Sequence, residues 1–161
     1  METKTVCAVI GTTLKETEGI QYTTDAVSAK VNELVKNGTV DFLCHAGYGF
    51  PLQAAEAVIA LRDARKQQGL DTPQLCIIAP HESQSSDWSD EARERYYSVH
   101  EHTDGVSFFQ NRYSDDCYEK CEQYMIDNSD CVLCDDETST AAQYAKSQGK
   151  TVVVCEVLSV A

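Results

Sequence analysis

Three polar loops carry the residue types that could bind or transform a ligand, and they span residues 45–51, 81–88 and 135–141. Each loop follows an apolar, strand-like run and leads into a helix-like segment. The sequence contains no His-Glu-x-x-His spacing of zinc peptidases, no Gly-x-Ser-x-Gly elbow and no Gly-Lys-Ser/Thr phosphate loop. We therefore predict a ligand-binding site with no assigned catalytic residue and no resident cofactor.

The first loop is rich in glycine and reads His45-Ala46-Gly47-Tyr48-Gly49-Phe50-Pro51. Two glycines allow the backbone to approach a ligand closely, and the free N–H groups at a helix start favour an anion. The loop departs from the dinucleotide fingerprint because Leu52 stands where a third small residue belongs. Either an anion site or a tight turn explains the glycines. The candidate ligand-binding residues here are Ala46, Gly47, Tyr48, Gly49 and Phe50.

The loop after the expected fifth strand combines carboxylates with hydroxyls. Thr138, Ser139 and Thr140 could offer hydroxyl and N–H donors to a phosphate, or one of them could simply cap the following helix. Asp135 and Asp136 could accept hydrogen bonds from ribose hydroxyls, or they could be solvated loop charges. All five residues are candidates for the ligand site.

The third loop contains the single tryptophan, Trp88, in a polar setting. This ring could provide a stacking surface for a base, or it could pack as a lid on the helix behind it. His81 in the same loop is the one histidine with a case for chemistry. His100 and His102 fall at the end of an expected helix and should lie in solvent, whereas His45 ends a strand.

Eight cysteines invite a zinc interpretation, with Cys131 and Cys134 as one close pair and Cys117 and Cys121 as another. Residues three apart on a strand point to opposite faces, so Cys131 and Cys134 could chelate one ion only if the strand broke into a turn. Six of the eight fall in apolar strand-like runs, where cysteine is a small core residue. We predict no metal site and reduced thiols, as in a cytoplasmic protein.

The charge balance excludes several classes of partner. With 13 basic and 26 acidic residues, the net charge is −13, and such a surface repels nucleic acid and anionic lipid. The densest basic cluster, Arg62, Arg65 and Lys66, fits a solvated helix face. No apolar run approaches the ~20 residues of a membrane span, and the N-terminal segment lacks signal-peptide character. We expect a cytoplasmic protein with neither a nucleic-acid nor a membrane partner.

Strand-like and helix-like segments alternate along the whole chain. Strands are expected at 5–10, 40–44, 75–79, 105–109, 131–134 and 151–157. Helices are expected from Thr24 to Gly38, from Pro51 to about Gly69, after Ser89, around 118–125 and at 141–148. This alternation predicts an α/β fold, a single Rossmann-like three-layer sandwich with a mostly parallel sheet, over residues 1–161 as one domain. Such sheets bind ligands at the carboxyl ends of their strands.

An ordered series of short motifs carries a family resemblance. In chain order they are Cys7–Gly11, Ala46–Phe50 with Ala54–Val58, Gln84 with Trp88, Arg93–Tyr96, Tyr124–Asp130, Tyr144–Lys146 and Gly149–Lys150. From about Val6 to Val154 the chain resembles the YpsA-like family of the SLOG superfamily, which also holds the DprA proteins and the LOG phosphoribohydrolases. The resemblance implies a Rossmann-like fold with a nucleotide pocket at the first, second and fifth strand loops. It adds Gly11, Thr12, Thr13 and Gln84 to the candidate ligand-binding residues.

The chain departs from the family pattern where activity would reside. Thr12-Thr13-Leu14 replaces the usual His-Arg-Pro, Thr138-Ser139-Thr140 replaces a Gly-Gly-Thr turn, and Gln143 stands at the position of the LOG glutamate. A phosphoribohydrolase needs a carboxylate there to stabilise oxocarbenium-like charge or to activate water. We therefore expect binding of a nucleotide or nucleotide-derived small molecule without catalysis.

Two alternatives stay open at this point: a hydrolase, and a purely interacting protein whose pocket is vestigial. A LOG-like hydrolase of an N-glycosidic bond would use Asp135, Asp136 or Glu137 as its acid or base. The resemblance also implies a homodimer, and apolar stripes on the helices that bear Tyr96, Tyr97, Tyr118 and Tyr124 could support one.

Overall fold

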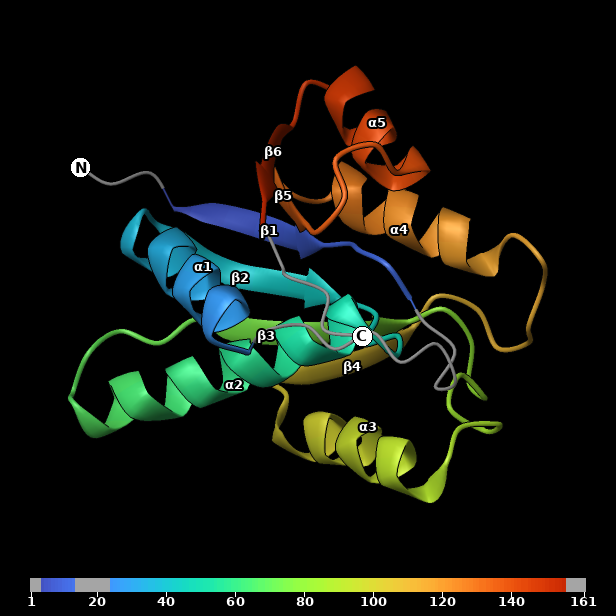
Figure 1. Cartoon of the computed structure of the whole chain (residues 1–161), viewed down its shortest axis with the longest axis horizontal. Coiled ribbons are helices and arrows are strands. Elements are labelled where there is room, and N and C mark those ends of the chain that lie inside the picture. Colours follow the sequence, from blue (N-terminus) through green and yellow to red (C-terminus); the bar gives the residue numbers. More distant parts are fainter. Residues whose placement is uncertain (1–3, 14–23, 156–161) are drawn as a thin grey trace.

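The computed structural model describes residues 4–13 and 24–155, and its centre is a six-stranded sheet (Figure 1). The strands are β1 (Thr5–Val9), β2 (Thr39–Cys44), β3 (Gln74–Ala79), β4 (Gly105–Phe108), β5 (Cys131–Cys134) and β6 (Thr151–Val154). All pairs of neighbours are parallel, and the strand order is β4-β3-β2-β1-β5-β6. The predicted Rossmann-like α/β fold is confirmed. The last strand ends before its predicted limit, and residues 156 and 157 lie outside the described part.

Five helices cover the two faces of this sheet. They are α1 (Thr24–Lys36), α2 (Phe50–Gln67), α3 (Asp90–His102), α4 (Cys117–Asp127) and α5 (Thr140–Ser147). Figure 1 shows α1, α2 and α3 on one face and α4 and α5 on the other. The helix starts follow their sequence signals, because Pro51 lies in the first turn of α2 and Ser89 caps α3 by accepting a hydrogen bond from the Ala92 N–H at 3.2 Å.

The central strand β1 contributes side chains to the hydrophobic cores on both faces of the sheet, because successive side chains point to opposite faces. Cys7 and Val9 belong to the core under α1 and α2, whereas Ala8 and Ile10 belong to the core under α4 and α5. Cys7 pairs in register with Phe42 of β2 on one side and with Cys131 of β5 on the other. β1 is therefore buried on both faces and paired along both edges.

The cysteines follow the core interpretation. All eight are free, seven of them are buried, and Cys76 is partly buried. In the described part of the chain no three His, Cys, Asp or Glu residues lie close enough together to hold a metal ion. None of the described helices has the length and apolar character needed to cross a bilayer.

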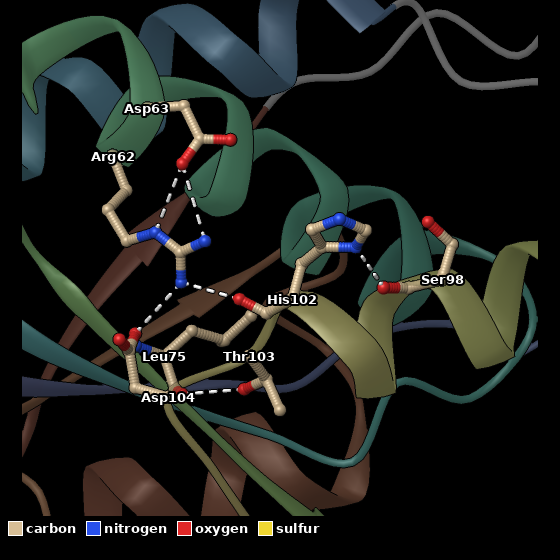
Figure 2. A network of polar contacts seen from close by, with 7 residues as sticks. All are labelled: Arg62, Asp63, Leu75, Ser98, His102, Thr103 and Asp104. Atoms are coloured by element: carbon tan, nitrogen blue, oxygen red, sulfur yellow. Dashed lines mark hydrogen bonds and ion pairs between the residues drawn. The ribbon is translucent and has the colours of Figure 1, made fainter. Parts of the chain in front are cut away.

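The basic cluster on α2 differs from the predicted solvated face. The Arg62 side chain is only 17% exposed, and its Nη1 donates to the His102 carbonyl at 2.6 Å and to Asp104 Oδ2 at 3.2 Å (Figure 2). Asp104 also accepts a hydrogen bond from the Leu75 N–H at 2.8 Å. Arg62 therefore joins α2 to the end of α3 and the start of β3. Sequence could not indicate this contact, since the residues are 40 or more positions apart where they pair.

One helix stripe also differs from its prediction. Tyr96 is 4% exposed and belongs to the core, so it cannot contribute to an exposed apolar surface. Tyr97 and Tyr124 are each 49% exposed. The homodimer stays a prediction.

Candidate functional site

A cavity of about 820 Å³ lies where the loops after β1, β2, β3 and β4 meet. We call it the main cavity. Its lining residues are Thr13, Tyr48, His81, Glu82, Ser83, Gln84, Ser86, Asp87, Trp88, Asn111, Arg112, Tyr113 and Tyr118. This is the carboxyl end of a parallel sheet, where Rossmann-like proteins bind their ligands. The volume falls within the ~300–1,000 Å³ of ordinary small-molecule sites.

Aromatic rings form much of the wall of the main cavity. The Trp88 ring meets Tyr48 edge to face with centroids 5.9 Å apart, and it packs on Tyr96 of α3 at 5.1 Å. At the start of the same loop, the His81 ring packs against Tyr113 and Tyr118, with ring centroids 5.4 Å and 6.4 Å away. Trp88 packs on the helix behind it, as one sequence interpretation has it, and it also lines the cavity; base stacking on its ring stays a prediction. Edge-to-face packing holds such rings in fixed orientations.

Buried polar groups lie behind these rings. Gln84 is 4% exposed, and its Oε1 accepts a hydrogen bond from the Tyr96 hydroxyl at 2.8 Å. Its Nε2 is buried beside Tyr118 yet makes no hydrogen bond of acceptable geometry in the described structure. A buried donor without an acceptor is costly, and a ligand acceptor would remove that cost. Gln84 thus brings a buried amide to the wall of the main cavity.

Burial also sets the protonation of the titratable groups here. It raises the pKa of Tyr118 to about 12, so this phenol stays a neutral donor. It lowers the pKa of His81, against a smaller opposing effect of Asp87, so the imidazole is neutral at pH 7. The cavity therefore presents mostly neutral hydrogen-bonding groups, with Arg112 as the cation and with Glu82 and Asp87 as carboxylates among its lining.

The glycine loop is closed by contacts within the chain. The Gly47 N–H donates to His45 Nδ1 at 2.9 Å, and the Phe50 N–H donates to the Thr12 carbonyl at 3.1 Å. A Cβ on Gly47 would lie 2.8 Å from both His45 Cε1 and Thr13 Cγ2, and Gly49 has a φ of 122°. The tight-turn interpretation therefore explains both glycines. Ala46 also adopts a positive φ, of 57°, within this loop.

A buried histidine supports the same loop. His45 is 1% exposed, its Nε2 lies 3.8 Å from Glu122 Oε2, and its ring meets Tyr118 edge to face at 5.3 Å. Because its Nδ1 accepts the Gly47 N–H, Nε2 carries the proton in the neutral ring. His45 is thus a positioning residue between the glycine loop and α4.

The loop after β5 contacts the loop after β1 but does not line the main cavity. Asp135 Oδ1 accepts the Thr12 N–H at 3.0 Å and would lie 2.9 Å from a Cβ on Gly11. Asp136 Oδ1 accepts both the N–H and the hydroxyl of Thr138, and these hydrogen bonds lower the pKa of Asp136. Ser139 caps α5 by accepting the Ala142 N–H at 3.1 Å. The capping alternative therefore describes Ser139.

Of the predicted site residues, the structure brings Thr13, Tyr48, Gln84 and Trp88 together in the main cavity. The others lie in the loop packing beside it (Gly11, Thr12, Ala46, Gly47, Gly49, Phe50) or in the segment from the end of β5 to the first residue of α5 (Asp135, Asp136, Thr138, Ser139, Thr140). Sequence reasoning did not single out Glu82, Ser83, Ser86 and Asp87 within the β3–α3 loop, and as site residues it missed Asn111, Arg112, Tyr113 and Tyr118. Their signal was available, because a polar, tyrosine-containing loop follows the predicted fourth strand and every such loop reaches this edge of the sheet.

Comparison with known proteins identifies a family, curated relatives and a solved structure that resemble this chain. A model of the YspA SLOG family (YpsA) matches residues 9–153. UPF0398 proteins of Staphylococcus aureus strains JH9 and JH1 are each 24% identical over 149 residues, which is 87% of this chain and 77% of the relative. A structure of DNA processing protein A from Helicobacter pylori, described for its single-stranded DNA binding mode, superposes with a TM-score of 0.60 at 16% identity. That match covers 92% of this chain but 64% of the other, and it shows a shared fold.

Proposed function

The chain belongs to the YpsA SLOG family, and from that premise we propose that it binds a nucleotide or nucleotide-derived small molecule in the main cavity without transforming it. The observation that carries the proposal is the combination of aromatic walls with a buried amide donor, Gln84 Nε2, which lies beside the Tyr118 hydroxyl without a hydrogen bond of good geometry. A planar nucleobase fits this arrangement, because its face can stack on the aromatic rings and its edge carries acceptor atoms for the amide. Stacking contributes about 1–3 kcal/mol per base in comparable sites.

The charges around the cavity favour a ligand with few phosphates. Arg112 is the cation of the lining, and Glu82 and Asp87 oppose a dense negative charge. The net charge of −13 acts in the same direction and disfavours a polynucleotide, although the H. pylori structural neighbour is described as binding single-stranded DNA. We therefore propose a mononucleotide or nucleoside derivative as the ligand class.

A hydrolase is the second candidate, and the observation in its favour is that Glu82 and Asp87 line the main cavity. The carboxylates first considered for this role lie elsewhere. Asp135 accepts the Thr12 N–H of the loop after β1, and Asp136 accepts the Thr138 N–H in its own loop. The Glu137 side chain is 61% exposed and pairs with Lys146. Hydrolysis of an N-glycosidic bond would therefore have to use the β3–α3 loop.

Native mass spectrometry with a panel of nucleosides, nucleoside monophosphates, NAD and cyclic nucleotides tests both candidates. Tyr113 and Tyr124 provide a matched pair, since both are largely exposed but only Tyr113 lines the main cavity. We expect one panel member to bind unchanged, Tyr113→Ala to weaken it about tenfold, and Tyr124→Ala to leave it intact. Absence of any ligand, or equal binding by the two variants, would overturn the proposal. Release of free base, abolished by Glu82→Gln, would establish the hydrolase instead.

A further inference from the structure

A second cavity, of about 340 Å³, lies on the other side of the loop between β3 and α3. We call it the α3 cavity. Its lining residues are Glu82, Ser83, Ser85, Ser86, Arg93, Tyr96, Tyr97, His100 and Phe108. It shares Glu82, Ser83 and Ser86 with the main cavity, but neither Gln84 nor Trp88 lines it. The Arg93–Tyr96 motif, which helped to reveal the family, contributes two of its residues and has no place in the main cavity.

Arg93 has donors that the described structure leaves unused. Its Nη2 donates to the Tyr97 hydroxyl at 3.2 Å, and its Nε is buried without a partner. The neighbouring Arg95 behaves differently, because Glu56 accepts from its Nε at 3.2 Å and from its Nη2 at 2.6 Å. Among the described residues a carboxylate neutralises Arg95 in this way and none does so for Arg93. A guanidinium with a free Nε–H edge is suited to an anion with two oxygens.

His100 adds a second unsatisfied nitrogen. Its Nε2 is buried without a partner, and its ring lies against Tyr96 with centroids 4.2 Å apart. This corrects the expectation that His100 lies in solvent; it is half-buried because it follows Tyr96 by four residues and shares that face of α3. Burial lowers the pKa of His100, so the ring is mainly neutral at pH 7, and its Nε2–H tautomer can donate to an anion.

We propose that the α3 cavity binds a small oxyanion, such as a phosphate, sulfate or carboxylate group. Arg93 provides the charge, and Ser83, Ser85, Ser86, Tyr97 and His100 surround it with potential donors. Glu82 is the carboxylate in this lining and limits the affinity, so binding is weak for a free ion. The proposal does not depend on the proposed function, because it uses neither the aromatic walls nor the Gln84 amide of the main cavity.

Titration of ¹⁵N-labelled protein with inorganic phosphate tests this site, with sulfate and acetate as separate arms and chloride keeping the ionic strength constant. The Arg93 Nε–H and the amides of residues 83–86 are direct reporters. We expect saturable shifts at these groups with phosphate, and a loss of affinity of about tenfold or more in Arg93→Gln, since a charge-assisted hydrogen bond is worth about that factor. Arg93→Lys keeps the charge but loses the forked donors, and we expect intermediate affinity.

Arg112→Gln is the matched control, because Arg112 lines only the main cavity of the two. It removes the same charge and should leave phosphate binding unchanged. Equal weakening in the two glutamine variants would mean a general charge effect and would overturn the site. Loss of binding in Arg112→Gln alone would move the ion to the main cavity, and absence of saturable shifts in wild-type protein of normal melting temperature would refute the proposal outright.

Discussion

Replacing Asp104 by alanine should destabilise the fold by about 2 kcal/mol, because this carboxylate closes the network in Figure 2. Its Oδ2 accepts the Leu75 N–H at 2.8 Å and Arg62 Nη1 at 3.2 Å. Asp104, in the segment that follows α3, thereby joins the start of β3 to α2. The Asp104→Ala change removes both hydrogen bonds at once.

The magnitude follows from exposure. The Asp104 and Arg62 side chains are 33% and 17% exposed, so solvent screens their ion pair and its share is roughly 0.5–1 kcal/mol. The Leu75 residue is fully buried, and stranding its N–H costs about 1–2 kcal/mol. The sum corresponds to a fall in melting temperature of roughly 4–8 °C for a chain of this size.

Urea unfolding of Asp104→Ala, Asp104→Asn and Asp63→Ala measures these contributions separately. Asn retains an acceptor for Leu75 without the charge and should lose about half as much. Asp63 contacts the same arginine at 3.3 Å but is 55% exposed, so its alanine variant should lose less than about 0.5 kcal/mol, helped by alanine's helix propensity. If Asp104→Ala loses no more stability than Asp63→Ala, the network does not stabilise the fold and the reasoning is refuted.

Two further predictions concern the glycine loop and the buried histidine. Gly49→Val forces a β-branched residue to a φ of 122° and should lower the free energy of unfolding by about 1–3 kcal/mol. Gly69→Ala is the control, because φ is 71° there and no atom lies within 4 Å of a Cβ. A smaller loss of stability in Gly49→Val than in Gly69→Ala, measured by thermal unfolding, would contradict this. Burial lowers the pKa of His100 from 6.5, so on acidification the unfolded chain binds this proton before the folded chain does, and the stability falls as the pH drops through and below about 6.5. The urea midpoint should therefore fall less with acidification in His100→Phe than in the wild type. The same dependence of the urea midpoint on pH in both proteins would exclude the effect.

The order of strands and helices could be predicted from the sequence because each signal is local. Ser89 and Pro51 mark helix starts through their own backbone chemistry, and the family resemblance is confirmed by the match over residues 9–153. Strand order could not be read in this way. That β1 lies between β2 and β5 depends on packing among segments more than a hundred residues apart.

The site was harder to predict because its geometry depends on which residues fill space. The glycines of the loop after β2 looked like a ligand contact, yet His45 and Thr13 occupy the room beside Gly47. Tyr113 and Tyr118 carry no local ligand signal, because a tyrosine in a loop or on a helix stripe is equally typical of packing. His100 could have been placed correctly, since its four-residue spacing from buried Tyr96 is visible in the sequence.

The central place of β1 has a consequence for synthesis of the chain on the ribosome. One edge of β1 pairs with β2, but the other waits for Cys131, Val132 and Leu133 of β5, and the Val6 N–H bonds to Asp130 Oδ2 at 2.9 Å. Until residue 130 has emerged, a nascent chain with β1 to β4 already assembled exposes one edge of β1, whose residues Cys7, Ala8 and Val9 are fully buried in the finished fold. Open apolar edges recruit other strands. Translation past β5, rather than completion of the first half of the fold, is therefore the step that makes the growing polypeptide safe from aggregation.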